Sequence, residues 1–114
     1  MKRGEIWWAR IPMRGSGGIK HPMLIVSDDA FNTNIHYTKV MVVHLTSVKR
    51  THGPYDWEVS IPKGTAGLTR QSIAKCGEIY TLWKEQLQSL VGTVPRERMA
   101  EVNRALGVAL SLED

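Results

Sequence analysis

Two short segments of the chain end in side chains suited to phosphate chemistry. His21, with Lys20 before it, precedes the apolar run Met23–Val26, and Thr46 follows the apolar run Val40–Val43. An imidazole, whose pKa lies near roughly 6.5, exchanges protons at neutral pH, and a hydroxyl hydrogen-bonds a phosphate oxygen. If the two runs form neighbouring strands, the three polar side chains meet at one edge of a sheet. This edge is a candidate phosphate-handling site.

The two apolar runs have the length and boundaries of buried strands. Each is too short for an ordinary helix, and the first stops at Ser27-Asp28-Asp29. A glycine-rich segment, Arg14–Lys20, precedes the first run, and its composition predicts a loop. This loop lacks the Gly-Lys-Ser/Thr ending of a nucleotide-binding loop, although its backbone amides can still cradle one phosphate. A basic loop thus leads into a core strand, with the histidine at the junction.

The length and composition indicate one soluble domain. A chain of 114 residues can form a hydrophobic core without metal or disulfide support. Its single cysteine, Cys76, has no partner within the chain, which suits a reducing cytosol. No apolar run approaches the roughly 20 residues that span a bilayer, and the N-terminal residues lack a signal-peptide core. We therefore expect a cytoplasmic protein.

The positive charge is concentrated in the first half of the chain. Residues 1–56 contain eight Lys/Arg and four Asp/Glu, whereas the remaining residues contain seven of each. The net charge of +4 therefore lies in the half that holds the candidate site. This distribution suits a polyanionic partner, although solvated lysines at strand edges would give the same count.

The hydrophobic pattern predicts five strands and one C-terminal helix. Alternation and apolar runs place the strands at residues 4–12, 22–26, 38–46, 56–61 and 72–80. Gly77 is expected to bulge or bend the last strand. A short helical turn is expected at 82–88 and another after Asp28, a typical N-cap. A metal site at Asp28-Asp29 is not favoured, because no histidine or further acid stands at ligand spacing.

Alternating side chains predict which strand faces are buried. The adjacent Trp7 and Trp8 must point to opposite faces, so one lies in the core and the other serves a dimer interface or stacks on a base. Ile6 and Ile11 are expected on the Trp8 face. In the fourth strand, the residues expected to point inward are Trp57, Val59 and Ile61, and those outward Asp56, Glu58 and Ser60.

The C-terminal segment has the pattern of an amphipathic helix that begins at Pro95. Thr93 is a candidate N-cap. We expect one apolar stripe, with offsets of three and four, to pack on the sheet while the charged residues face solvent. The stripe comprises Met99, Val102, Leu106, Ala109 and Leu110.

Four segments, in this order along the chain, match a family pattern. They are Lys2–Trp7, His21–Ser27 followed by Ala30-Phe31-Asn32, Leu45-Thr46-Ser47, and the tail from Pro95 through Glu101–Leu106. Together they closely resemble the MazF/PemK toxins of bacterial toxin–antitoxin pairs, and the resemblance covers nearly the whole chain.

This resemblance implies a mostly β fold with α, namely a small SH3-like or CcdB-like β-barrel with a C-terminal helix packed on the sheet. One domain would span residues 1–114. The resemblance further implies a homodimeric, metal-independent endoribonuclease without cofactors, which cuts single-stranded mRNA to leave 2′,3′-cyclic phosphate and 5′-hydroxyl ends. The implied protein partner is a cognate antitoxin whose acidic, flexible tail covers the RNA groove.

The chain departs from the family pattern at positions that bear on catalysis. His21 stands where the family usually has an arginine that serves as acid/base and phosphate ligand, whereas the family's threonine is kept as Thr46. Gly15–Gly18 keeps a serine but lacks Glu-Gln, and Lys75–Glu78 replaces a segment that often reads Arg-Cys-Asp-Gln. Histidine carries protons at neutral pH far better than arginine, but it cannot clamp a phosphate with two parallel hydrogen bonds.

RNA cleavage without a metal requires a base, an acid, and cations or hydrogen-bond donors at the phosphate. We expect His21 to act as general acid/base and Thr46 to hydrogen-bond the scissile phosphate, with charge from Lys20 and from Arg14 or Lys75. The alternative for His21 is a structural role, with a hydrogen bond to a backbone carbonyl. The predicted phosphate- or RNA-binding residues are Arg14, Ser16, Lys20, Lys49, Arg50 and Lys75.

The remaining histidines and aromatic residues are secondary candidates. His44 shares a strand face with Thr46 if the pleating is regular, so it either approaches the site or is structural. His36 and His52 fall in predicted loops, and His52 is placed to touch RNA or the antitoxin. Aromatic residues that can stack on bases are Tyr55, Tyr80 and Trp83, although core or interface packing is the alternative for Trp83.

Two other functions fit the same pattern. A catalytically weakened dimer would bind antitoxin or RNA without efficient cleavage, and the missing arginine favours this alternative. A toxin that acts on DNA gyrase is a further alternative, because another toxin family shares the expected barrel.

Overall fold

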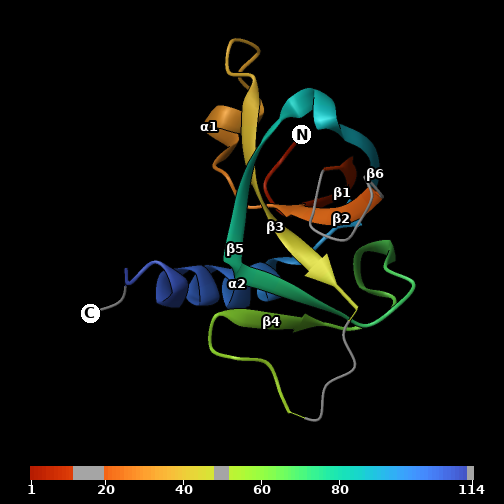
Figure 1. Cartoon of the computed structure of the whole chain (residues 1–114), viewed down its shortest axis with the longest axis vertical. Coiled ribbons are helices and arrows are strands. Elements are labelled where there is room, and N and C mark those ends of the chain that lie inside the picture. Colours follow the sequence, from red (N-terminus) through yellow and green to blue (C-terminus); the bar gives the residue numbers. More distant parts are fainter. Residues whose placement is uncertain (12–19, 48–51, 113–114) are drawn as a thin grey trace.

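Six strands form one antiparallel sheet in the computed structural model, which describes residues 1–11, 20–47 and 52–112. The strand order is β4-β5-β3-β2-β1-β6. The strands are β1 (Glu5–Arg10), β2 (Lys20–Ile25), β3 (Lys39–Thr46), β4 (Glu58–Ile61), β5 (Ser72–Trp83) and β6 (Leu87–Thr93). The helices are α1 (Asp29–Asn32) and α2 (Arg96–Ala109), and the 3₁₀ turns are η1 (Thr65–Gly67) and η2 (Lys84–Gln86). Figure 1 shows the long β5 crossing the molecule beside β3, with α2 near its lower half.

The sheet bends strongly but does not close on itself, because β4 and β6 remain as edges. The expected mostly β fold with a C-terminal helix is therefore confirmed, and the word barrel applies only loosely. The bend involves β5, whose register against β3 shifts between Val43, which pairs with Ile79, and His44, which pairs with Lys75. Gly77 lies in the resulting bulge, as its sequence position predicted.

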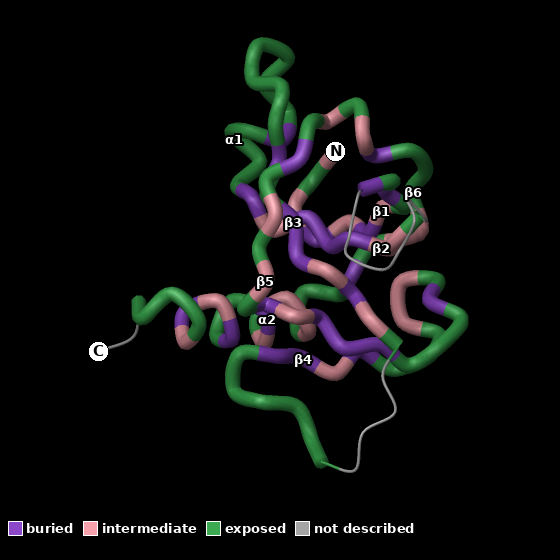
Figure 2. The backbone as a smooth tube through the Cα atoms, in the orientation of Figure 1, coloured by how far each residue is buried: buried purple, intermediate pink, exposed green. Residues whose placement is uncertain are grey.

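Both faces of the central strands are buried, in two separate apolar clusters. Leu24 and Val43 belong to the cluster that includes residues of α2, whereas their neighbours Met23 and Val42 belong to the other. Figure 2 shows the buried backbone running along β2 and β3. Because each face packs against apolar neighbours, these strands are continuous apolar runs rather than alternating ones.

The helix α2 packs on the sheet, as expected, but with a shifted stripe. Val102 and Ala105 are buried in the first cluster, and Met99 and Leu106 pack against it, whereas Leu110 is 53% exposed. The predicted N-cap, Thr93, is wrong: the cap position is Pro95, which makes no side-chain hydrogen bond. Ala109 is also exposed, because the last turn extends beyond the sheet.

Two edge elements differ from the sequence-based expectation. A strand, β6, lies at residues 87–93, for most of which no element was expected, and the helical turn expected at 82–88 is limited to η2 because β5 continues to Trp83. β6 pairs with β1 through two register irregularities, which remove the regular alternation from its sequence. In β4, Val59 and Ile61 are buried as expected, but Glu58 is buried as well, and Trp57, which precedes the strand, is 43% exposed.

The orientation of β1 is partly as expected. Ile6 joins the first cluster, but Ile11 joins the second with Ala9, and Trp7 packs against that cluster. The assignment of Ile11 to the Trp8 face was therefore wrong, since strict alternation puts it with Trp7. Trp8 is the exposed member of the tryptophan pair, at 38%.

A hydrogen-bonded polar network anchors the segment after β2. Asp28 caps α1 by accepting the Ala30 backbone N–H at 2.9 Å, as expected. The buried Asn32 accepts the Ser27 hydroxyl and donates to the Ser27 carbonyl at 2.8 Å. Asp29 accepts the Arg3 backbone N–H at 2.7 Å, which ties the N-terminal segment to the helix.

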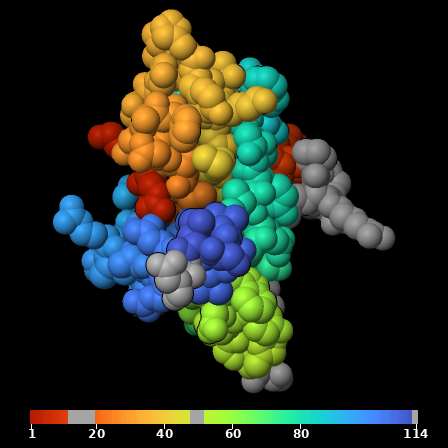
Figure 3. Space-filling model, turned by 90° about the vertical axis from the view of Figure 1, so that its left-hand side faces the viewer, coloured from red at the N-terminus to blue at the C-terminus, as the bar shows by residue number. Residues whose placement is uncertain are grey.

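The molecule measures 42 × 37 × 26 Å. In Figure 3, the segment after α1 projects at one end and the segment before β4 at the other, so the two loops are far apart. Within the described ranges, no helix is long and apolar enough to cross a membrane.

Candidate active site

A cavity of about 500 Å³ opens where β2 and β3 meet the segment after η1. Its lining includes His21 and Pro22 from β2 and His44 and Thr46 from β3. The imidazole and the hydroxyl that the sequence singled out therefore line one cavity. The remaining residues of its wall are Trp8, Leu45, Ser47, Gly67, Leu68, Thr69, Arg70, Ser72 and Val91.

Strand register explains why these side chains converge. β1 and β2 pair Ala9 with His21, and β2 and β3 pair Met23 with His44. Continuing the second register by two residues brings His21 level with Thr46. Directly opposed residues of antiparallel strands point to the same face, so the antiparallel pairing itself sets up the site.

His21 and His44 are in ring contact. Their ring centroids lie 5.2 Å apart at an interplanar angle of 86°, an edge-to-face arrangement. Both side chains are half-buried. The Nε2 atom of His21 is buried and, among the described residues, has no hydrogen-bond partner. A buried, unpaired imidazole nitrogen is costly, and Nε2 makes no hydrogen bond to a backbone carbonyl of the described residues.

The environment of His44 opposes its protonation. Burial lowers the pKa of His44 below its ordinary value, and the nearby charge of His21 lowers it further. Glu78 acts in the opposite direction, and Lys75 adds to the lowering. The neutral form of His44 is therefore favoured, and a neutral imidazole can accept a proton.

Among the cationic candidates, Arg70 lies in the cavity wall, and the sequence had not singled it out. It is exposed and follows η1, whose Gly67 has a φ of +77°. A Cβ at Gly67 would stand 2.8 Å from the Val91 carbonyl oxygen, so only glycine allows η1 to pack this closely on β6. That contact fixes the start of the segment that carries Arg70 to the cavity.

The other predicted cations are placed differently. Lys20 is exposed at the start of β2, opposite Arg10, but it is not part of the cavity wall. Lys75 is paired with Glu78 at 2.7 Å and also lies outside the wall. Four predicted phosphate- or RNA-binding residues lie outside the described residues: Arg14, Ser16, Lys49 and Arg50.

One aromatic candidate, Trp8, belongs to the site, and the others lie elsewhere. Trp8 lines the cavity, whereas Trp7 donates its indole N–H to Glu5 at 3.0 Å and faces the second cluster. Before β4, Tyr55 stacks on Trp57 with centroids 4.8 Å apart. His52 continues this stack at 5.2 Å from Tyr55.

Of the two remaining aromatic candidates, Tyr80 packs partly buried against the second cluster. Trp83 is 49% exposed beneath the Lys39 ammonium, so it is not a core residue.

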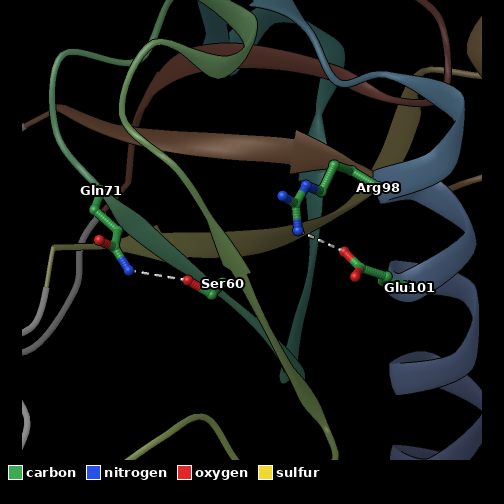
Figure 4. Close-up of polar contacts among 4 residues, drawn as sticks. All are labelled: Ser60, Gln71, Arg98 and Glu101. Atoms are coloured by element: carbon green, nitrogen blue, oxygen red, sulfur yellow. Dashed lines mark hydrogen bonds and ion pairs between the residues drawn. The ribbon is translucent and has the colours of Figure 1, made fainter.

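Two further cavities lie away from these histidines. One, of about 580 Å³, is lined by Tyr37, Trp83 and the segment after α1. The other, of about 500 Å³, separates β4 from α2 and contains Arg98 paired with Glu101 at 3.1 Å. Figure 4 shows this ion pair and the Gln71 amide donating to the Ser60 hydroxyl. Neither cavity combines an imidazole with a hydroxyl, so we assign the candidate site to the cavity at His21.

Within the described part of the chain, no three His, Cys, Asp or Glu side chains are grouped as metal ligands would be. Asp28 and Asp29 instead accept backbone N–H groups, as described above. Burial raises the pKa of the Cys76 thiol to about 11, with a smaller contribution from Glu58, so this cysteine is not a nucleophile at neutral pH.

Comparisons with known proteins identify the family to which the chain is similar. Residues 2–110 match the family described as PemK-like, MazF-like toxin of type II toxin-antitoxin system. Endoribonuclease MazF6 of Mycobacterium tuberculosis is 33% identical over 114 residues, covering 98% of both chains. Endoribonuclease MazF of Staphylococcus saprophyticus is 29% identical, covering 98% of this chain and 92% of the relative.

Solved structures show the same fold. An endoribonuclease in complex with its cognate antitoxin, from a mycobacterial species, superposes with a TM-score of 0.82 at 29% identity. The superposition covers 100% of this chain and 98% of the other. MazF from Deinococcus radiodurans superposes with a TM-score of 0.74 at 20% identity, covering 97% and 96%, a likeness of fold alone.

Proposed function

The chain belongs to the PemK-like, MazF-like toxin family of type II toxin–antitoxin systems, and on that premise we propose that it is a metal-independent endoribonuclease of single-stranded mRNA. Its relatives named as endoribonucleases cover nearly its whole length. The proposed products are a 2′,3′-cyclic phosphate and a 5′-hydroxyl. These ends arise when the ribose 2′-oxygen attacks the adjacent phosphorus and the 5′-oxygen leaves.

The observation that carries the proposal is the convergence of His21 and Thr46 on one cavity. In the proposed mechanism His21 exchanges a proton with the reacting oxygens. General acid–base catalysis of this kind raises the reaction rate by roughly 10²–10⁴-fold. Thr46 donates its hydroxyl to a non-bridging phosphate oxygen. The unpaired Nε2 of His21 supports a role in which its hydrogen-bond partner is supplied by the substrate.

Positive charge at the phosphate is the third requirement, and Arg70 is our first candidate for it. Arg70 lines the cavity and is exposed, so its guanidinium is available to a phosphate. A guanidinium can bind a phosphate through two parallel hydrogen bonds, the contact that His21 cannot make. Lys20 and the basic residues outside the described ranges would act at a longer distance, by attracting the RNA.

We also propose a homodimer that acts in the cytoplasm and is neutralised by a cognate antitoxin with an acidic, flexible tail. A relative solved with its cognate antitoxin supports the antitoxin partner. The exposed Trp8 on β1 supports a protein contact, because exposed apolar side chains mark interaction surfaces.

A second function deserves a test, namely a toxin relative that binds antitoxin or RNA without efficient cleavage. The observation in its favour is that Lys75, in the segment that often reads Arg-Cys-Asp-Gln in the family, forms an ion pair with Glu78 at 2.7 Å. Such a protein would keep the fold and the dimer but would not turn over RNA.

One assay separates the two functions. Purified protein is incubated in EDTA with a mixed-sequence single-stranded RNA, and the fragments that carry 5′-hydroxyl ends are sequenced. Defined cuts that disappear in His21→Ala and in Thr46→Ala, but persist in His36→Ala, would support the nuclease. Intact RNA with retained antitoxin binding would support the silent relative. His36 is a suitable control because it lies in the exposed loop between α1 and β3.

A further inference from the structure

His44 lies in the wall of the candidate site, beside His21. It lines the same cavity as His21 and Thr46, and its ring meets the ring of His21 edge to face at 5.2 Å. Its strand neighbours Val43 and Leu45 point into the first apolar cluster, so the pleat turns His44 to the face that Thr46 shares. Two imidazoles and one hydroxyl therefore meet at one place in the fold.

We propose that the protein cleaves RNA with a pair of histidines, in which His44 is the general base and His21 is the general acid. This inference rests on the proposed endoribonuclease function and specifies its proton transfers. It makes His44 a catalytic residue, although the resemblance to the family assigns no role to this position.

Burial and the neighbouring charges act on the protonation of His44. His44 faces His21 from β2, Lys75 and Glu78 from β5, and Arg70 across the cavity. Glu78, which would favour a charged His44, is itself paired with Lys75 at 2.7 Å. Burial and the charge of His21 both disfavour a proton on His44. The neutral form of His44 is therefore favoured and ready to accept a proton, and the geometry leaves the role of proton donor to His21, whose ring it contacts.

The proposed step is balanced without water or a co-reactant. A nitrogen of neutral His44 takes the proton of the 2′-hydroxyl while the 2′-oxygen forms a bond to phosphorus. The bond between phosphorus and the 5′-oxygen breaks, and protonated His21 gives its proton to that oxygen. The products are a 2′,3′-cyclic phosphate and a 5′-hydroxyl, and the proton left on His44 returns to His21 through solvent.

The test uses a leaving group that needs no acid. The cut site of the wild-type protein is first mapped, and an oligonucleotide is made with a bridging sulfur in place of the 5′-oxygen at that linkage. His21→Gln should lose roughly 10²–10⁴-fold in cleavage of the normal RNA and regain most of this loss on the thio-substituted RNA. His44→Gln should lose a similar factor on both substrates, because a better leaving group does not replace the base.

The outcomes separate this inference from the function on which it rests. If wild-type protein does not cut RNA, the proposed function fails and the inference fails with it. If wild-type protein cuts RNA but His44→Gln cuts within threefold of its rate, His44 is not the base and the endoribonuclease assignment stands. If sulfur rescues His44→Gln instead of His21→Gln, the pair exists with its roles reversed and the stated assignment is wrong. Thermal unfolding of both variants establishes that they are folded, and His36→Gln serves as the matched control.

The pH profile gives a second readout that a structural role would not affect. Wild-type kcat/KM should be bell-shaped, because His44 must be neutral and His21 must be protonated. The acid limb, at which activity falls as pH decreases, should lie below about 6.5, where burial places the pKa of His44. His44→Gln should flatten this limb and leave the alkaline limb. A variant that keeps the acid limb would overturn the assignment.

Discussion

The strand β2 connects two polar regions that differ in how their hydrogen bonds are satisfied. After its C-terminal end, the buried Ser27 and Asn32 bond to each other, and Asn32 also donates to Asp29 at 2.9 Å. Near its N-terminal end, the buried Nε2 of His21 has no partner among the described residues, although the ring lines a cavity. Leaving a buried polar atom unpaired costs about 1–3 kcal/mol.

This difference separates residues that stabilise the fold from residues that await a ligand. A network in which every donor and acceptor is paired gains rigidity from burial, whereas an unpaired imidazole in a cavity costs stability that only a bound partner can return. Proteins tolerate such unfavourable groups mainly where function requires them. A stabilising polar network therefore follows the C-terminal end of β2, and a candidate catalytic residue lies near its N-terminal end.

Replacing His21 is the strongest test of this comparison. His21→Ala should lower RNA cleavage by roughly 10²–10⁴-fold, or about 3–5 kcal/mol of transition-state stabilisation, because it removes a proton carrier. The melting temperature should stay the same or rise, since an unpaired buried nitrogen is removed. Single-turnover cleavage and thermal unfolding measure the two effects. A variant that loses several degrees of melting temperature and keeps its cleavage rate would assign His21 to the scaffold.

Replacing Asn32 should give the opposite result, with a smaller effect. Asn32→Ala removes three hydrogen bonds and leaves the Ser27 hydroxyl without its acceptor, which should lower the free energy of unfolding by about 2–3 kcal/mol. The cleavage rate of the folded protein should not change. Urea unfolding measures the stability, and reaction of the Cys76 thiol reports opening, because this thiol is fully buried. Asn34→Ala, at an exposed loop position, is the matched control, and an equal loss of stability there would contradict the role of the network.

Replacing Arg70 should have a moderate effect on activity alone. Arg70→Gln should slow cleavage by roughly tenfold, or about 1.4 kcal/mol, because the phosphorane loses one nearby cation. The loss should shrink as salt is raised, since salt already screens the cation in the wild-type protein. Arg96→Gln, an exposed arginine in the first turn of α2, is the control for net charge. Equal rates for the two variants would remove Arg70 from the site.

The smallest expected effect is the pH dependence contributed by Asp29. Hydrogen bonds from the Arg3 backbone N–H and from Asn32 hold the pKa of Asp29 below its usual 3.8. The folded protein therefore binds this proton less readily than the unfolded chain does, so the carboxylate stabilises the fold above about pH 3.8. That contribution is lost as the pH falls through the lowered pKa. Asp29→Asn should reduce the difference in unfolding free energy between pH 6 and pH 3, and an unchanged difference would show that Asp29 does not contribute.

The sequence was sufficient for the parts of the site that depend on local pattern. The apolar runs before Thr46 and after His21 identified β2 and β3, and antiparallel pairing of neighbouring strands brought their polar ends together. His44 also points to the face opposite Val43 and Leu45, as regular pleating predicted. These residues were accessible to prediction because strand length and alternation are local properties.

The parts that were missed depend on contacts between distant segments. Arg70 reaches the cavity because η1 packs on β6, a contact that no local pattern reveals. β6 itself escaped prediction because its irregular pairing with β1 removes alternation. Trp57 was expected in the core because it alternates with Val59 and Ile61. Instead it precedes β4, stacks on Tyr55 and packs closely over the backbone of Gly77, which has no side chain.

The pairing of β1 with β6 sets the order in which the parts of the candidate site can come together. β1 comes from the start of the chain and β6 from residues 87–93, so one edge of β1 stays open until those residues emerge from the ribosome. Because η1 packs on β6, the segment that carries Arg70 to the cavity can take its place only once β6 is present. The cavity at His21 therefore cannot be complete in a growing chain before the residues of β6 have been added.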